Sequence, residues 1–395
     1  MKSALVTISF AAVLLLASAQ AQDITITWQV RNHNISKGYL PKLASDGLQN
    51  VVTIDQINQG KRTADGSFND ISAFQTQIGT IDTASVSWAG VSEYLYSPPQ
   101  TTPQIGLAPS IALYLETAYP NCDSAIEVHQ GAQDAEGSLW YQLGSNCSPE
   151  FSDIIWGKAI HYGTGYNATV AADLNESRPR RTTVVEAHQA EQGTSPLWYK
   201  VGVLTGQGKL GAAPSIIWGP TTEMMGSNGG ATQGVIPTVS VANNLAIVVY
   251  ESSESDGVLW YSLGEVDTAT STIAWGDPIF YGYGFNPTVS IYGDGTSSYG
   301  LGAGRVVVEA HQTGTGTDIG ALEYTAGLLT GATPTSITWS TSENNSYANG
   351  CYPSVALFFD GSTGTTSSVG VAETHETACG TAKINYSFGY LTSTP

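Results

Sequence analysis

Two short apolar runs separated by a polar turn recur along the chain, and the clearest copy spans residues 182–202. The first run is rich in β-branched residues and ends in Glu-x-His-Gln at 186–189, and the second is Leu-Trp-Tyr at 197–199. Valine, tryptophan and tyrosine favour the pleated, half-buried surface of a sheet. Gly193 and Pro196 supply turn residues between the two runs. The pattern therefore predicts a β-hairpin.

Four sequence signals recur in a fixed order. They are a Pro or Asn-x-Thr start with a short Ser/Thr-rich strand, Val-Val-Glu-x-His-Gln, Leu-Trp-Tyr-x-x-Gly and Ile-x-Trp-Gly. The tryptophans of the last signal lie 57 to 68 residues apart and number six, namely Trp28, Trp88, Trp156, Trp218, Trp275 and Trp339. The repeat starts also number six, namely Pro41, Pro109, Ala168, Pro237, Pro287 and Pro353. A period of about sixty residues with four short strands is typical of a propeller blade.

The strands of one repeat are termed a to d, and in the third repeat they are predicted at 169–172, 183–189, 197–202 and 215–218. The first repeat is the most degenerate, with residues 51–56 as strand b. A β-helix needs shorter repeats, and a sandwich has no reason to repeat one sequence six times. The sequence therefore predicts an all-β, six-bladed β-propeller with four antiparallel strands in each blade.

The two ends of the chain predict how the ring closes. The last repeat supplies strands a, b and c and then ends without a strand d. Residues 24–28 precede the first strand a and closely match residues 336–339, which form strand d of the fifth repeat. We expect residues 24–28 to complete the last blade, because closure removes an open sheet edge. Residues 22–395 then form a single domain.

Composition and the first residues indicate an exported chain. Residues 1–21 combine Lys2, an apolar core and a small-residue cleavage site, as in a secretory signal peptide. No later segment approaches the length of a membrane-spanning helix. The formal net charge is −19 and charged residues make up only 12% of the chain, which disfavours nucleic acid as a partner. The expected location is extracellular.

Four cysteines in an exported chain indicate two disulfides. Cys122 and Cys147 lie in one repeat, and Cys351 and Cys379 lie in another. Pairing within repeats is the simplest of the three possible connectivities, and each bridge would then tie together one blade. The chain has no Cys-x-x-Cys sequence, so a zinc ribbon or a redox motif is not expected.

The repeated signals resemble those of secreted β-propeller repeat proteins with the Pro-Ser-Val-Ala, Val-Val-Glu-x-His-Gln, Leu-Trp-Tyr-x-x-Gly and Ile-x-Trp-Gly pattern. This resemblance covers nearly all of the chain after the signal peptide and implies architecture and secretion, but no catalytic residues. A looser resemblance is to six-bladed propeller lectins, whose pockets between blades use Arg, Glu and an aromatic residue. In this chain Arg does not recur with the repeat.

The Glu-x-His signal places a carboxylate and an imidazole on one face of strand b, because side chains alternate along a strand. The four pairs are Glu127 and His129, Glu186 and His188, Glu309 and His311, and Glu373 and His375. One interpretation is an acid/base or metal site. The other is a buried hydrogen-bond network that fixes blade packing, which four copies favour over a unique active site. We therefore predict a structural network, no catalytic residue, no metal and no cofactor.

The connections from strand d to the next strand a are rich in aromatic residues and glycine. We predict that they are loops at the rim of the central channel, where aromatic rings can stack on sugars. The candidate ligand-binding residues are Tyr162, Tyr166, Tyr281, Tyr283, Phe285, Tyr347 and Tyr352. The alternative is that these rings only pack between neighbouring blades.

Glycosylation sequons are a further surface signal in an exported chain. The candidate sites are Asn34, Asn167, Asn175, Asn344 and Asn385.

The function that the sequence favours is non-catalytic, lectin-like binding of glycans or other extracellular ligands. The first alternative is a structural protein that assembles with copies of itself. The second is a glycoside hydrolase or lyase with an active site in the central cleft.

Overall fold

The computed structural model describes residues 23–48, 50–56, 74–82, 85–89, 92–93, 106–115, 123–131, 137–146, 154–173, 182–205, 214–293, 304–315, 318–331, 333–340, 345–360 and 368–394. Within these ranges every regular element is a β-strand, which agrees with the all-β prediction. No membrane-spanning helix is found among them. The predictions for residues 1–21, Cys122, Cys147, Asn175 and Asn344 fall outside the described residues.

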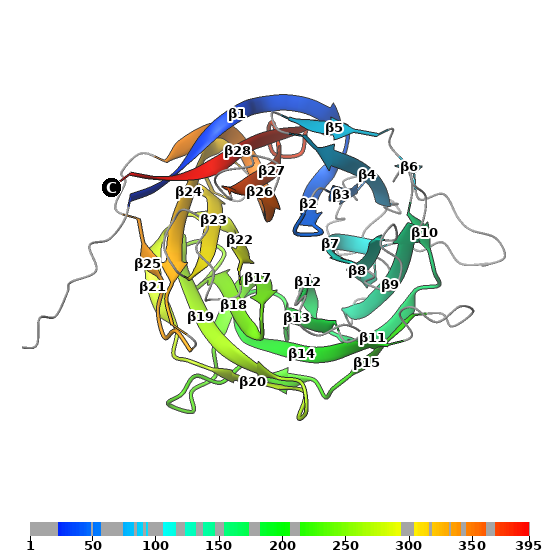
Figure 1. The fold of residues 1–395 in the computed structure, drawn as a ribbon. Coiled ribbons are helices and arrows are strands. Elements are labelled where there is room, and N and C mark those ends of the chain that lie inside the picture. Colours follow the sequence, from blue (N-terminus) through cyan, green and yellow to red (C-terminus); the bar gives the residue numbers. More distant parts are fainter. Residues whose placement is uncertain are drawn as a thin grey trace, which may run out of the picture.

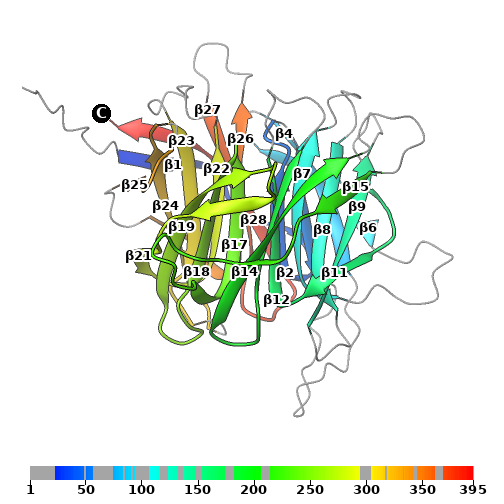
Figure 2. The same cartoon turned by 90° about the horizontal axis from the view of Figure 1, so that it is seen from below.

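Consecutive strands pair antiparallel in chain order, and the resulting four-stranded units stand around a common axis (Figure 1). Strand a of each unit lies nearest the axis, as β2, β7 and β17 show in Figure 1. The side view of Figure 2 shows that the units stand side by side with their long strands along the axis.

The strands of the units, each written in the order a to d, have the following bounds. The first units are β2 (Tyr39–Ser45), β3 (Asn50–Gln56), β4 (Phe74–Ile81) and β5 (Val86–Trp88), then β7 (Gly106–Leu115), β8 (Asp123–Gly131), β9 (Ser138–Asn146) and β10 (Ile155–Trp156). The next are β12 (Tyr166–Ala172), β13 (Thr183–Gln189), β14 (Ser195–Thr205) and β15 (Ser215–Trp218), then β17 (Gln233–Ala242), β18 (Leu245–Glu251), β19 (Val258–Asp267) and β20 (Thr272–Trp275). The last are β22 (Phe285–Tyr292), β23 (Arg305–Gln312), β24 (Gly320–Leu329) and β25 (Thr338–Trp339), then β26 (Ser346–Asp360), β27 (Ser368–Glu376), β28 (Ile384–Thr394) and β1 (Asp23–Ser36).

The chain ends meet in the last of these units, which we call the closing unit. Ile24 lies opposite Ser393 and Trp28 lies opposite Gly389, so β1 is the fourth strand beside β28. This pairing confirms the prediction that residues 24–28 complete the sheet that the C-terminal strands begin. The ring is therefore joined at this point by hydrogen bonds and packing, since the chain itself does not continue across the joint.

One contact explains two of the sequence signals. The glycine of Leu-Trp-Tyr-x-x-Gly lies directly opposite the tryptophan of Ile-x-Trp-Gly in every unit, as in Gly202 with Trp218. A Cβ atom at Gly202 would come within 2.7 Å of the Trp218 ring. The same pairing joins Gly79 to Trp88, Gly144 to Trp156, Gly264 to Trp275, Gly327 to Trp339 and Gly389 to Trp28. Only glycine leaves room for the indole, which is why the two motifs repeat together.

The connections from strand d to strand a are not loops, which corrects the prediction. They form the short strands β6 (Ser92–Glu93), β11 (Ile160–Thr164), β16 (Thr222–Glu223) and β21 (Ile279–Tyr283), and each pairs with strand c of its own unit. In the fifth unit the first residues of β26 pair with β24 in the same way. Pairing satisfies backbone groups that a loop would leave to water.

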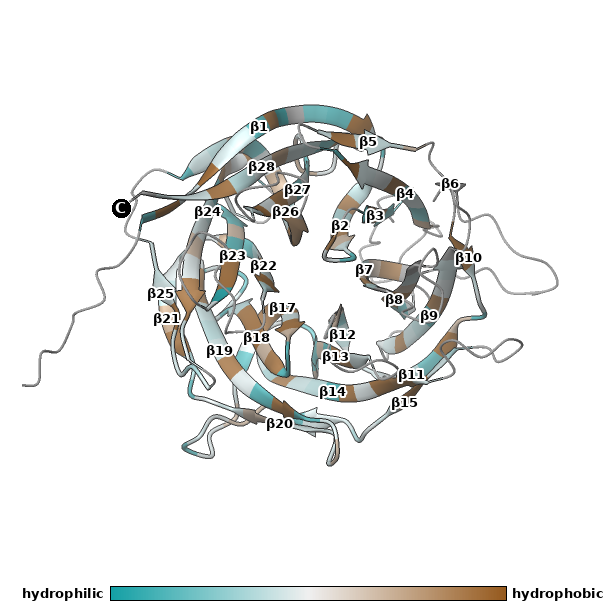
Figure 3. Cartoon of the chain, viewed as in Figure 1, coloured by the Kyte–Doolittle hydropathy of each residue, from teal (hydrophilic) through white to brown (hydrophobic). Residues whose placement is uncertain are grey.

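The hydrophobic core lies between neighbouring units. In one cluster Val185 and Tyr199 of the third unit contact Val239, Val248 and Trp275 of the fourth. Figure 3 shows apolar segments on strands throughout the ring, including inner strands such as β17. All seven residues of β13 are buried, since both faces of each sheet are covered by the adjacent units. Burial of apolar area on both faces is the main force that holds the units together.

Candidate functional site

Each strand nearest the axis has, in its first half, a residue in the left-handed region of the backbone. These residues have φ between 49° and 54°, and they are Leu40, Ala108, Asn167, Ile236, Asn286 and Tyr352. Each lies in a register shift between strands a and b of its unit, which marks a β-bulge. A residue other than glycine adopts this conformation only where its surroundings hold it.

A side chain of the preceding unit holds most of these bulges in place, and we call this contact the latch. The last residue of strand b is Gln or Glu, and its Oε1 accepts the backbone N–H of the left-handed residue in the next unit. The N to Oε1 distances are 2.8 Å for Ala108 and Gln56, 2.9 Å for Ile236 and Gln189, 2.6 Å for Asn286 and Glu251, 2.9 Å for Tyr352 and Gln312, and 2.7 Å for Leu40 and Glu376. The last of these bonds links the closing unit to the first unit.

One latch is missing from the described part of the chain. By position Gln130 should bond the backbone N–H of Asn167, but no such bond is formed among the described residues. Gln130 instead lines a cavity of about 260 Å³, together with Asn167. The amide of Gln130 is thus available for a ligand at the place where the ring of latches is interrupted.

This cavity, which we call the mouth pocket, lies where strands a begin and strands b end. Its lining comprises Leu40, Gln56, Leu107, Ala108, Gln130, Tyr166, Asn167, Gln192, Gly193 and Glu254. The residues come from the starts of β2, β7 and β12, the ends of β3 and β8, and the b–c turns after β13 and β18. The pocket therefore opens at the end of the ring that carries the b–c turns, which is the end at which the sequence predicts binding.

Hydrogen bonds within the third unit orient the amide of Asn167. Its Nδ2 donates to Oε1 of the fully buried Gln189 at 2.6 Å. Nε2 of Gln189 in turn donates to the carbonyl of Gly193 at 2.8 Å, so Gln189 positions two parts of the lining. With Nδ2 engaged, Asn167 offers Oδ1 as an acceptor to a ligand.

Tyr166 supplies the aromatic ring of the mouth pocket. A Cβ atom at Gly137 would lie 2.8 Å from Cζ of Tyr166, so the ring packs directly on a glycine of the preceding unit. The half-buried ring is thereby held in one place while it lines the pocket. Of the aromatic residues predicted to bind ligand, Tyr166 is the one that lines this cavity.

Three of the other predicted ligand-binding rings pack between units and do not line the mouth pocket. Tyr162 stacks on Trp218 with the ring centroids 5.5 Å apart, Tyr281 stacks on Trp339 at 5.6 Å, and Tyr347 stacks on Trp28 at 4.9 Å. They lie on paired strands, and the tryptophan of the next unit covers each ring. Their role is the alternative that the sequence left open, packing between neighbours.

The remaining candidates lie outside the mouth pocket. Tyr283 is 70% exposed, and its ring contacts Phe280. The ring of Phe285 packs on Gly257, as Tyr166 does on Gly137. Tyr352 is half-buried, and its backbone N–H donates to Gln312 in a latch. No cavity described here joins these three residues into one site.

The four Glu-x-His pairs are buried and hydrogen-bonded, as strand alternation predicts. The shortest distances from His Nδ1 to the glutamate are 2.9 Å for His129 and His188 and 3.0 Å for His311 and His375. The hydroxyl of Tyr162 donates to Glu186 at 3.1 Å, which extends one pair into the preceding unit. Burial, and then the Glu186 carboxylate, raise the pKa of Tyr162 well above its usual value.

Burial, and then the charge of Glu309, raise the pKa of Tyr281 well above its usual value, and burial and Glu373 do the same for Tyr347. At His311 burial lowers the pKa, but the Glu309 and Glu323 carboxylates outweigh burial and raise it. None of these groups lines the mouth pocket. Among the described residues, no group of three or more His, Cys, Asp or Glu side chains is placed to hold a metal ion.

The structure joins Cys351 to Cys379 in a disulfide, which confirms one predicted bridge. Two predicted sequons face each other across the joint, since Asn34 lies opposite Asn385 in the pairing of β1 and β28. The sequon at Asn167 is poorly placed for N-glycosylation, because its Nδ2 donates a hydrogen bond to Oε1 of Gln189 beside the mouth pocket.

A second cavity of about 100 Å³ lies inside the ring among the innermost strands. Most of its lining residues have apolar side chains, such as Leu113, Val170, Val241 and Leu357, although the surface that they expose is more polar than apolar. The mouth pocket is larger, and polar side chains such as Gln130 and Asn167 line it. We therefore take the mouth pocket as the candidate binding site.

The sequence reasoning missed Gln130, Gln192 and Glu254. The sequence shows that the Gln of Val-Val-Glu-x-His-Gln recurs, but it does not show that this side chain forms the latch. Whether Gln130 reaches the N–H of Asn167 depends on the relative positions of two units, and a local sequence pattern does not determine those positions.

Comparisons with known proteins bear on the fold. No protein-family model and no curated protein matches the sequence. One similar solved structure is a mutant α-L-arabinofuranosidase from Fusarium graminearum bound to an iminosugar inhibitor. The two sequences are 13% identical, the match covers 91% of this chain and 97% of that chain, and the TM-score is 0.50. A Dyadobacter fermentans protein of unknown function gives 8% identity, 94% and 98% coverage, and a TM-score of 0.50.

The hemagglutinin-neuraminidase ectodomain of parainfluenza virus 5 gives 8% identity over 94% of this chain and 87% of that chain, again with a TM-score of 0.50. At such low identity these similarities show the fold alone. The chain has a β-propeller fold built from antiparallel sheets.

Proposed function

We propose that this protein is a secreted, six-bladed β-propeller that binds glycans at the mouth pocket without catalysing a reaction. The observation that carries the proposal is the lining of this pocket. Gln130 offers an amide, Asn167 offers a fixed acceptor and Tyr166 offers an aromatic ring. Sugars need this combination, because their hydroxyls donate and accept hydrogen bonds and their C–H faces stack on rings.

The size of the pocket supports a small ligand. Its volume of about 260 Å³ lies just below the range of roughly 300–1,000 Å³ that is usual for small-molecule sites. A single sugar ring or the end of a longer glycan is the ligand that we expect.

The charges in the pocket support binding rather than hydrolysis. Glycoside hydrolases with the usual mechanism use two carboxyl groups about 5–10 Å apart on either side of the scissile bond. The described lining includes the carboxylate of Glu254 but no second one. The fold neighbours include an arabinofuranosidase, and we carry over from it the propeller architecture but not the reaction.

A matched pair of variants tests the site. Asn167→Gly removes the acceptor without straining the left-handed backbone, because glycine accepts positive φ. Asn286→Gly makes the same change at the equivalent bulge of another unit, which does not line the pocket. On a glycan array we expect Asn167→Gly to reduce binding at least tenfold and Asn286→Gly to leave it within about twofold.

Two outcomes would overturn the proposal. The first is a wild-type protein that binds no glycan but grows in particle mass with concentration, which would favour the assembly alternative. The second is turnover of aryl glycosides that Asn167→Gly abolishes, which would favour a hydrolase.

A further inference from the structure

We infer that the mouth pocket selects uncharged sugars and rejects anionic ones, such as uronic acids and sialylated or sulfated glycans. The inference rests on the proposed function and adds the class of ligand. Its basis is the set of charges at and around the pocket.

The described lining carries polar side chains but no cation. Its described residues include no Lys or Arg, and they include Glu254, an exposed acidic side chain. An anionic sugar would need an Arg or Lys partner to offset its desolvation. The amides of Gln130 and Asn167 give hydrogen bonds that suit hydroxyl groups but provide no net charge.

The titratable groups next to the lining are acidic rather than basic. Asp256 lies two residues from Glu254 in the same turn. Oε1 of Glu376 lies 2.7 Å from the backbone nitrogen of Leu40, which lines the pocket. Burial raises the pKa of Glu251 to about 7 and raises that of Glu376, so these two carboxyl groups carry less negative charge than exposed ones but supply no positive charge. An anion entering the pocket would meet Glu254 and no cation on the described lining.

The nearest lysine in sequence does not reverse this balance. Lys42 lies two residues beyond Leu40 on β2 and is not part of the lining. Burial lowers the pKa of Lys42 to about 8, so a substantial fraction of this amine is neutral in mildly alkaline solution. The formal net charge of −19 adds long-range repulsion of the same sign.

The test compares sugars that differ only in charge. Calorimetric titrations would use methyl β-D-galactoside against methyl β-D-galacturonate, methyl β-D-glucoside against methyl β-D-glucuronate, and lactose against 3′-sialyllactose. For the pair that binds, we expect the neutral sugar to bind at least tenfold more tightly at low salt. The ratio should shrink at high salt, because added ions screen the repulsion between exposed charges.

Two charge variants locate the effect. Glu254→Gln should reduce the ratio of neutral to anionic affinity by about threefold to tenfold. Glu265→Gln changes the net charge equally but lies on the exposed part of β19, outside the pocket, and should leave the ratio unchanged.

The outcomes separate the inference from the function on which it rests. Equal or tighter binding of the anionic sugar by the wild type, with loss of binding in Asn167→Gly, would overturn the selectivity and keep the site. An equal shift of the ratio in Glu254→Gln and Glu265→Gln would also overturn the inference, because selectivity would then follow net charge alone. Absence of binding for every sugar, neutral and anionic, would remove the proposed function and the inference together.

Discussion

At the scale of single residues, the latch shows how one side chain can hold a strained backbone. Gln and Glu both offer Oε1 to the N–H of a left-handed residue, and both occur in this position, as in Gln312 and Glu251. They differ in charge, and a buried carboxylate loses hydration that one N–H replaces only in part. Burial accordingly raises the pKa of Glu251 to about 7 and raises that of Glu376.

The raised pKa of Glu251 predicts a pH-dependent stability that Glu251→Gln removes. Because the folded-state pKa lies above the ordinary value of 4.5, the protonated group stabilises the fold fully below pH 4.5. That contribution is lost as the pH rises through about 7. Glu251→Gln keeps the acceptor for Asn286 without the charge, so it should raise the free energy of unfolding by about 1–3 kcal/mol at pH 8 and change it little at pH 4.5.

Denaturant unfolding at both pH values measures this difference. Gln312→Glu is the reciprocal control, and it should destabilise the protein at pH 8 but not at pH 4.5. A Glu251→Gln difference that is the same at both pH values would show that the carboxylate is not the source of the effect.

At the scale of elements, strands β13 and β18 form the same part of two units with different side chains. β13 carries Glu186 and His188, whereas β18 carries Val248 and Tyr250 at the aligned positions, and all four are buried. Two solutions therefore fill the same space, one polar and paired and the other largely apolar. A paired network can be replaced as a whole more easily than in part, because a single change leaves a buried partner without its hydrogen bond.

This comparison predicts a non-additive pair of substitutions in β13. Glu186→Val alone removes the acceptor of both His188 and Tyr162, and it should lower the free energy of unfolding by about 2–4 kcal/mol. The double change Glu186→Val with His188→Tyr reproduces β18 and should cost at least about 1 kcal/mol less than the sum of the single changes. Chemical denaturation of the three variants completes the double-mutant cycle. Strictly additive effects would argue against a coupled network.

The elements also show how far the sequence predicts the structure. The residues of β13 and β15 match their predicted bounds, since apolar periodicity and the spacing of tryptophans are local signals. The glycines of the d–a connections favour loops in the sequence. In the structure some of them make room for rings instead, since a Cβ at Gly165 would lie 2.3 Å from Cδ2 of His188 and one at Gly284 would lie 2.1 Å from Cδ2 of His311. Composition alone cannot separate a glycine needed for packing from one needed for a turn.

The candidate site was predictable only in part. The aromatic residues and the end of the ring at which they lie follow from the repeat, and Tyr166 does line the pocket. The contribution of Glu254 depends on how the b–c turn of one unit reaches toward its neighbours. Such a contact is set by tertiary packing, and no periodic signal in one sequence encodes it.

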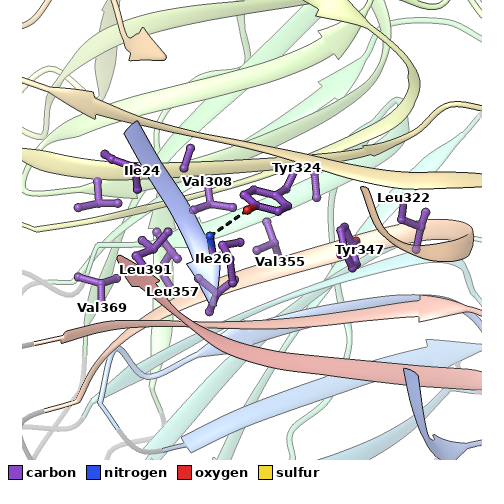
Figure 4. Close-up of a cluster of buried hydrophobic side chains, with 14 of the residues drawn as sticks. Ile24, Ile26, Val308, Leu322, Tyr324, Tyr347, Val355, Leu357, Val369 and Leu391 are labelled. Atoms are coloured by element: carbon purple, nitrogen blue, oxygen red, sulfur yellow. Dashed lines mark hydrogen bonds between the residues drawn. The ribbon is translucent and has the colours of Figure 1, made fainter. Parts of the chain in front are cut away.

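At the scale of the whole molecule, the joint between the chain ends uses the same contacts as the continuous joints. The hydroxyl of Tyr324 accepts the N–H of Ile26 at 2.9 Å across the joint, and the dashed line in Figure 4 marks this bond among the apolar side chains of β1 and its neighbours. The hydroxyl of Tyr261 accepts the N–H of Ile337 at 3.1 Å within the continuous part of the chain. The two bonds are equivalent except for how the segment that donates the N–H is attached to the rest of the chain.

That equivalence predicts a difference in local opening between two matched variants. Tyr324→Phe and Tyr261→Phe each leave one buried N–H without its acceptor, and each should lower the free energy of unfolding by about 1–2 kcal/mol. In Tyr324→Phe the unpaired strand is the start of the chain, so β1 can separate from β28 without unfolding the rest. In Tyr324→Phe, the amide hydrogen exchange rates of Ile24, Ile26 and Trp28 should therefore increase by more than the loss of global stability alone predicts. In Tyr261→Phe, the exchange rate of the Ile337 amide should increase only by the amount that the loss of global stability predicts. Exchange at Ile26 that follows global unfolding in both variants would contradict this prediction, because the pairing of β1 with β28 and the stacking of Trp28 on Tyr347 would then hold β1 in place without the Tyr324 hydroxyl.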